Sequence, residues 1–131
     1  MKGLDTNVLI RYLTQDHPGQ AARANALIAA AAAKREKLYL DVVVLCETVW
    51  VLRGAYGLDK STVAETMQKI LGTAHFSVED RDLVAEAVSA YQAGTGDFAD
   101  HLLGARNRRA GCDTTLTFDR ALRRSGLFLL L

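Results

Sequence analysis

Four acidic residues interrupt stretches of small or apolar residues, and their carboxylates are the groups in this sequence best suited to chemistry. Asp5 directly follows the stretch Lys2–Leu4, and Asp119 directly follows the stretch TTLTF. Glu47 lies among apolar residues, and Asp100 lies one turn into a helical pattern. Ligands of open α/β sheets bind at the carboxyl ends of parallel strands, where Asp5 and Asp119 are expected. The four acids are therefore candidates for one shared pocket.

A pocket that held all four carboxylates would be stable only with bound cations or protons. Two carboxylates ~5 Å apart repel each other by about 3 kcal/mol at an effective dielectric constant of ~20. Hard divalent ions such as Mg²⁺ and Mn²⁺ prefer oxygen ligands, and a pocket without His or Cys favours them over zinc. One or two such ions could lower the pKa of a bound water and hold the oxygens of an in-line attack on a phosphodiester.

Glu47 is the least conventional of the four acids. A helix that begins after Asp41 has apolar side chains on nearly every face, so Glu47 is expected to be buried. Burial of an unpaired carboxylate costs several kcal/mol or forces it to take up a proton, so Glu47 needs a partner. Trp50 in the same segment is expected to belong to the core rather than to a base-stacking platform.

Helix capping is the simpler explanation for some of these acids. Asp5 and Asp119 each stand between a predicted strand and a predicted helix, where an acid often accepts hydrogen bonds from free backbone amides. Asp97 is better placed than Asp100 to cap the helix that contains both. Capping does not account for Glu47, because Glu47 lies inside a helix.

The elements that would position these acids alternate between strands and helices. Strand patterns separated by helices of ten to fifteen residues predict right-handed crossovers and a parallel sheet. We expect an α/β fold of three layers, α/β/α, around a central parallel sheet of about five strands, in one domain over residues 1–131. The expected strands are 2–4, 37–40, 74–78, 112–118 and 127–131, with the segment 42–45 open to either helix or strand.

Composition excludes several classes of protein. No run of 18 or more apolar residues occurs and the start lacks a signal peptide pattern, so we expect a cytoplasmic protein without a membrane partner. The two cysteines suggest neither a disulfide framework nor a zinc site. The formal net charge of +1 means that any contact with nucleic acid must be local.

Four segments occur along the chain in this order: LDTNVLIRYL, LCETVWVLRGAYGL, DFADHLLGARNRRAGC and LTFDRAL. In this order they resemble the PIN-domain family, and specifically the VapC-like toxins of bacterial and archaeal type II toxin–antitoxin pairs. The resemblance runs from Met1 to about Leu127. The segment DHLLGA departs slightly from the family pattern, which is closer to DALIAA in many relatives, but it retains the acid.

The resemblance implies a metal-dependent endoribonuclease that forms a homodimer and binds a cognate antitoxin. The implied catalytic residues and ligands of one or two Mg²⁺ or Mn²⁺ ions are Asp5, Glu47, Asp100 and Asp119. Thr6 and Thr117 match polar positions that hydrogen-bond to the carboxylates or to the attacking water. Asn7 matches a residue that supports Asp5, and Asp97 is expected to support the site from the helix cap.

RNA is the expected substrate, and a few arginines are expected to neutralise its phosphates. The first candidates are Arg11, Arg106 and Arg109. Two other functions remain open: a receiver-like phosphoacceptor domain and a non-catalytic partner-binding module. The receiver chemistry needs a Lys after a late strand, and the chain has no Lys beyond Lys69.

Overall fold

The computed structural model describes all residues from 1 to 131 and contains six α-helices, one short 3-10 helix and five strands. The predicted alternation of helices and strands is confirmed, and the segment after Asp41 is helical. The helices are α1 (Thr6–Thr14), α2 (Pro18–Ala33), α3 (Val42–Gly54), α4 (Lys60–Leu71), α5 (Arg81–Ala93), α6 (Phe98–Arg109) and the 3-10 helix η1 (Arg120–Leu122). The strands are β1 (Lys2–Gly3), β2 (Leu38–Leu40), β3 (Phe76–Val78), β4 (Thr115–Thr117) and β5 (Phe128–Leu130).

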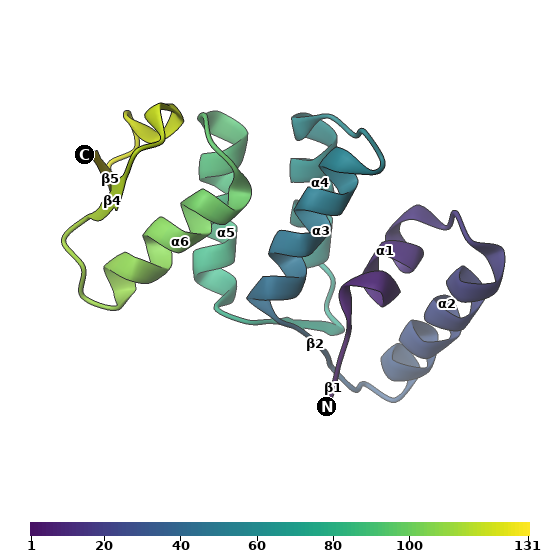
Figure 1. Ribbon diagram of the computed structural model, residues 1–131. Coiled ribbons are helices and arrows are strands. Elements are labelled where there is room, and N and C mark those ends of the chain that lie inside the picture. The colour runs from purple at the N-terminus through teal and green to yellow at the C-terminus, as the bar shows by residue number, and fades with distance from the viewer.

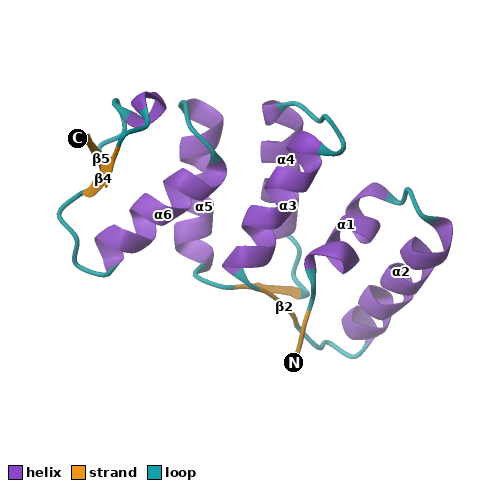
Figure 2. Cartoon of the chain, in the orientation of Figure 1, coloured by secondary structure: helices purple, strands orange, loops and turns teal.

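The strands are all parallel, but they form two sheets instead of one. One sheet has the order β1-β2-β3, with Lys2 opposite Leu38 and Leu38 opposite Phe76. The other consists of β4 and β5 alone (Figure 2). The α/β class is therefore confirmed. The five strands, however, pair as a sheet of three and a sheet of two, and not as the expected single sheet.

Packing against α6 explains where the second sheet lies. A Cβ atom at Gly104 of α6 would come within 2.8 Å of the Phe128 ring and 3.0 Å of Leu127, so β5 lies directly on the helix. Leu122 of η1 packs in the same way over Gly96, where φ is +95°. β4 and β5 are thus held by α6 and by the loop before it.

The helices form a continuous row from one end of the molecule to the other (Figure 1). α1 packs on α2 and on α3, α3 packs on α4, α4 on α5, and α5 on α6. The β4–β5 pair lies beyond α6, at the opposite end from α2 (Figure 1). The residues that follow β1 and those that follow β4 are therefore separated by the intervening helices.

One hydrophobic cluster of 27 buried residues holds the helices and the three-stranded sheet together. It extends from Leu4 to Ala105 and includes no residue of β4, η1 or β5. Phe98 at the start of α6 is fully buried and contacts the Tyr91 ring edge to face, with ring centroids 6.4 Å apart. The cluster thereby fixes the first turns of α1 and α6 relative to α3.

Two expectations about α3 are wrong. Leu45, Val49 and Leu52 are buried as expected, but Trp50 is 53% exposed and Glu47 is also exposed. The physical reason is helical spacing, because Val43, Glu47 and Trp50 recur at i, i+4 and i+7 and share the face opposite the core. Glu47 therefore carries none of the desolvation cost that a buried carboxylate would have.

No helix has the length and apolar content needed to cross a membrane.

Candidate active site

Thr6 links two of the predicted acids. Asp5 follows β1 and caps α1, with its Oδ1 accepting a hydrogen bond from the Thr6 backbone N–H at 2.8 Å. The Thr6 hydroxyl donates to Oε1 of Glu47 at 2.9 Å, although 41 residues separate the two in the chain. Thr6 is 7% exposed, whereas both acids face solvent. The start of α1 and the middle of α3 thus present two accessible carboxylates next to one buried hydroxyl.

A second pair of acids lies at the start of α6. The Asp97 backbone N–H donates to Oδ2 of Asp100 at 3.1 Å, and the Trp50 indole N–H donates to Oδ2 of Asp97 at 2.6 Å. Both acids are half-buried. Since Trp50 lies one turn beyond Glu47 on the same face of α3, the indole ties the α6 acids to the helix that carries Glu47. Trp50 was expected in the core, and nothing in the sequence indicated its contact with Asp97.

His101 packs behind Asp100. Its Nε2 lies 2.8 Å from the Thr95 backbone oxygen, its Nδ1 is buried without a hydrogen-bond partner, and the residue is 4% exposed. The histidine therefore supports the loop before α6 and takes no part in the exposed acid surface.

Asp119 does not join the other acids. It lies after β4 in the second sheet, where its Oδ1 accepts from the Ala121 N–H at 2.9 Å and caps η1. The Asp119 backbone N–H donates to the Thr117 hydroxyl at 3.0 Å, so Thr117 contacts the backbone of Asp119 and not a carboxylate as expected. The capping explanation therefore describes both Asp119 and Asp5 correctly.

The convergence of all four acids is not seen in this structure. No three His, Cys, Asp or Glu side chains lie close enough to hold one metal ion. The physical reason is strand pairing, because Asp5 follows a strand bonded only to β2 and Asp119 follows a strand bonded only to β5. The oxygen donors suit a hard divalent cation in their chemistry, but they are arranged as two pairs and one separate residue.

Cys46 of α3 lies beside Glu47 in the chain, and its thiol is uncharged. Burial raises the pKa of the Cys46 thiol to about 11, with the negative charge of Asp97 acting in the same direction. Cys46 lies one residue before Glu47 and is half-buried. It therefore stays a neutral thiol under ordinary conditions and is not a nucleophile of this site.

The predicted phosphate-binding arginines differ in their surroundings. Arg106 and Arg109 both lie within 4.0 Å of Asp80, at 3.6 and 3.9 Å, and Arg109 also bonds to Asp82. These two guanidinium groups are thus paired with acids at the start of α5. Their attraction for phosphate is correspondingly reduced.

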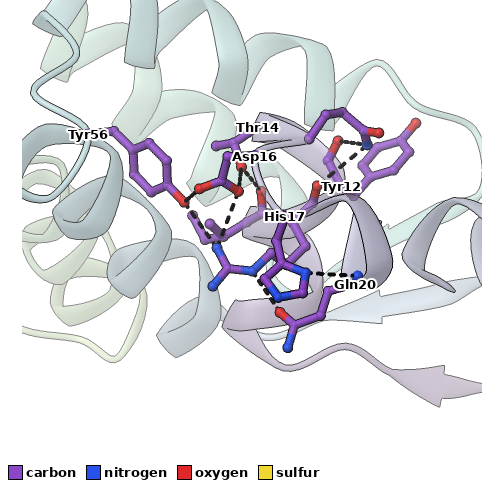
Figure 3. A network of polar contacts seen from close by, with 9 residues as sticks. Tyr12, Thr14, Asp16, His17, Gln20 and Tyr56 are labelled. Carbon is purple, nitrogen blue, oxygen red and sulfur yellow. Dashed lines mark hydrogen bonds and ion pairs between the residues drawn. The ribbon is translucent and has the colours of Figure 1, made fainter. Parts of the chain in front are cut away.

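Arg11 instead belongs to a polar network between α1, α2 and the end of α3. Its Nε donates to Gln20 at 2.7 Å, and its Nη1 donates to the Tyr56 hydroxyl at 3.1 Å and to Asp16 at 3.3 Å. The Tyr56 hydroxyl in turn donates to the other Asp16 oxygen at 2.6 Å (Figure 3). The network holds the guanidinium in one orientation.

A surface cleft adjoins this network. It has a volume of about 420 Å³ and contains Arg23, which was not among the expected phosphate-binding residues because a lone arginine in an Ala-rich helix gives no signal in the sequence. The cleft is lined by Asn7, Val8, Arg11, Gln20, Arg23, Ala24 and Leu27.

Comparison with known proteins agrees with the motifs and the fold. The family model described as the PIN domain matches residues 3–126. A VapC ribonuclease of Aquifex aeolicus (strain VF5) is 27% identical over 126 residues, which cover 96% of this chain and 93% of that protein. No solved structure was found to match the chain. Since the family match takes in the segments around all four predicted acids, the chain belongs to the PIN-domain family.

Proposed function

We propose that this protein is a metal-dependent endoribonuclease that hydrolyses RNA phosphodiester bonds. The observation that carries the proposal is the Thr6 hydroxyl bond to Glu47, which places Glu47 next to the Asp5 end of α1. Membership of the PIN-domain family and the likeness to a protein named VapC ribonuclease support the same activity.

The residues proposed to hold Mg²⁺ or Mn²⁺ are Asp5, Glu47, Asp100 and Asp119; they lie in separate groups in this structure, so a bound ion would have to draw them together. A divalent ion bound by these residues would supply a water of lowered pKa and neutralise charge on the phosphate. Thr6 donates to Glu47 and so orients its carboxylate, and Asn7 stands beside Asp5 on the first turn of α1. Asp97 is held by Trp50 and positions Asp100 through its backbone N–H.

The biological role that we propose is that of the toxin in a VapBC-type pair. Such a toxin cuts RNA in the cytoplasm, is held inactive by a cognate antitoxin, and forms a homodimer. The exposed apolar side chains Val43, Trp50 and Leu103 on α3 and α6 are consistent with a protein partner on that face.

The test is cleavage of end-labelled RNA by the purified protein with Mg²⁺, with Mn²⁺ and with EDTA. We expect cleavage only with the ions, and loss of cleavage in Asp5→Asn. Asp113→Asn provides a matched control, because Asp113 is exposed and has no hydrogen bond or ion pair. Undiminished cleavage in EDTA, or equal cleavage by Asp5→Asn and the wild type, would contradict the proposal.

A further inference from the structure

The cleft between α1 and α2 combines positive charge with a position at the start of α1, the helix that Asp5 caps. α1 contributes Asn7, Val8 and Arg11, and α2 contributes Gln20, Arg23, Ala24 and Leu27. Asn7 lies directly after Thr6, the residue that links Asp5 to Glu47. The cleft therefore begins at the first turn of α1, which Asp5 caps and whose Thr6 hydroxyl donates to Glu47 of α3.

The charges that line this cleft are all positive. Arg11 and Arg23 are its two ionised residues, and no Asp or Glu lines it. Arg23 is exposed and makes no ion pair or side-chain hydrogen bond with the protein. An unpaired guanidinium keeps its full capacity to bind an anion, in contrast to Arg106 and Arg109, which are already paired with Asp80.

Arg11 forms an ion pair with Asp16 at 3.3 Å, so it attracts an anion less strongly than Arg23 does, but its guanidinium is held in a fixed orientation. Its Nε and Nη1 are used by Gln20, Tyr56 and Asp16, whereas its Nη2 has no partner. Hydrogen bonds from Tyr56 and Thr14, together with the Arg11 charge, keep the pKa of Asp16 below its ordinary value, so the network stays charged. A guanidinium that is already oriented loses less conformational freedom when it binds a phosphate.

Two amide groups complete the polar lining. Gln20 accepts from Arg11 through Oε1, which leaves its NH₂ group free to donate, and the Asn7 side chain has no partner. The remaining lining residues are aliphatic and none is aromatic. Such a lining can follow a phosphate backbone but offers no platform on which a base would stack.

We propose that this cleft binds the phosphodiester backbone of the RNA on one side of the bond that is cut, with Arg23 and Arg11 as the phosphate-binding residues. The inference rests on the proposed ribonuclease function and assigns the path of its substrate. The contacts are to phosphates, so they hold RNA of many sequences and weaken with salt.

The experiment measures RNA binding separately from cleavage. A short fluorescently labelled single-stranded RNA is titrated with the full-length protein in EDTA, and anisotropy gives Kd at several salt concentrations. We expect Arg23→Gln to weaken binding about fivefold at low salt and to reduce the slope of log K against log salt by about 0.7. Arg108→Gln is the matched control, since Arg108 is exposed on α6 and unpaired, and its Kd should equal that of the wild type.

A second variant tests the cleft by changing its charge and leaves both arginines in place. Gln20→Glu retains an oxygen that can accept from Arg11 Nε but adds a negative charge to the cleft, so it should weaken RNA binding more than Gln68→Glu at an exposed position of α4. In cleavage assays with Mg²⁺, Arg23→Gln should raise KM and leave kcat nearly unchanged, because a remote phosphate contact binds substrate and transition state alike.

The outcomes distinguish this inference from the proposed function. If the wild type cuts RNA but Arg23→Gln and Gln20→Glu both bind with the wild-type Kd and salt slope, the cleft assignment is wrong and the ribonuclease stands. If no RNA is cut under any ion while binding still depends on Arg23, the ribonuclease fails and the backbone site stands. Absence of RNA binding by the wild type overturns the cleft assignment.

Discussion

The Thr6 hydroxyl donates a hydrogen bond of 2.9 Å to Oε1 of Glu47, and this contact joins the amino end of α1 to the exposed face of α3. Thr6 is buried while Glu47 is exposed, so the hydroxyl reaches the carboxylate from the protein side and leaves its other oxygen free toward solvent. The buried Thr6 hydroxyl thereby orients the Glu47 carboxylate, which stays accessible to a ligand.

Replacement of Thr6 by Val tests this contact. Val keeps nearly the same shape but removes the donor, so we expect the free energy of unfolding to fall by about 1 kcal/mol. RNA cleavage should fall by about tenfold, which corresponds to about 1.4 kcal/mol, because the Glu47 carboxylate loses its orientation. Urea unfolding and initial cleavage rates measure the two effects. Thr6→Ser retains a hydroxyl and should restore most of the activity, and failure of this rescue would remove the orienting role.

The acids after β1 and β4 are expected to differ in their importance for cleavage. Asp5→Asn and Asp119→Asn each keep an effective cap, because Asn caps helices about as well as Asp, so both proteins should remain as stable as the wild type. We expect Asp5→Asn to reduce cleavage more than about a hundredfold, equal to about 2.7 kcal/mol. Asp119→Asn should reduce cleavage less, since Asp119 lies in the separate β4–β5 sheet. Equal losses in the two variants would show that Asp119 reaches the other acids during the reaction.

Asp59 is expected to make the free energy of unfolding depend on pH in the acid range. A hydrogen bond from the Thr62 backbone N–H, at 2.8 Å, lowers the pKa of Asp59 below 3.8 and caps α4. A lowered folded-state pKa gives stability that is present above the unfolded-state value and is lost as pH falls through the folded-state value. In Asp59→Asn we therefore expect a smaller loss of stability between pH 4 and pH 2, with little change at pH 7. Urea midpoints at these three pH values provide the measurement, and parallel losses in both proteins would contradict it.

The two cysteines should react with alkylating reagents at different rates. Burial raises the pKa of Cys46 to about 11, whereas Cys112 is exposed in the segment after α6. Since the thiolate is the reactive form, iodoacetamide at pH 8 should modify Cys112 first and leave Cys46 largely unmodified in the folded protein. Peptide mass analysis after short labelling identifies the modified residue. Addition of urea should expose Cys46, and prompt labelling of Cys46 without urea would disprove its burial.

Local sequence was sufficient to predict most elements and their ends. Asp41, Asp59 and Asp97 each precede a helix, and Pro18 begins another. These signals depend on residues a few positions apart, so they can be read without the tertiary structure. The same reasoning identified the family, because its motifs keep a fixed order along the chain and the family match confirms that resemblance.

The sequence alone also indicated which residues carry negative charge, but only the tertiary structure decided which of them meet. Glu47 and Trp50 lie on the exposed face of α3 because α1 and α4 pack against other faces of the helix. Arg106 and Arg109 are less available to bind phosphate than expected, because both form ion pairs with Asp80, which lies 26 residues or more away in the chain. Asp119 stands apart because its strand bonds to β5 and packs on α6, while Thr6 brings Asp5 and Glu47 together across 41 residues. Such long-range pairings follow from strand order and helix packing, and these depend on the free energy of the whole fold rather than on any local pattern.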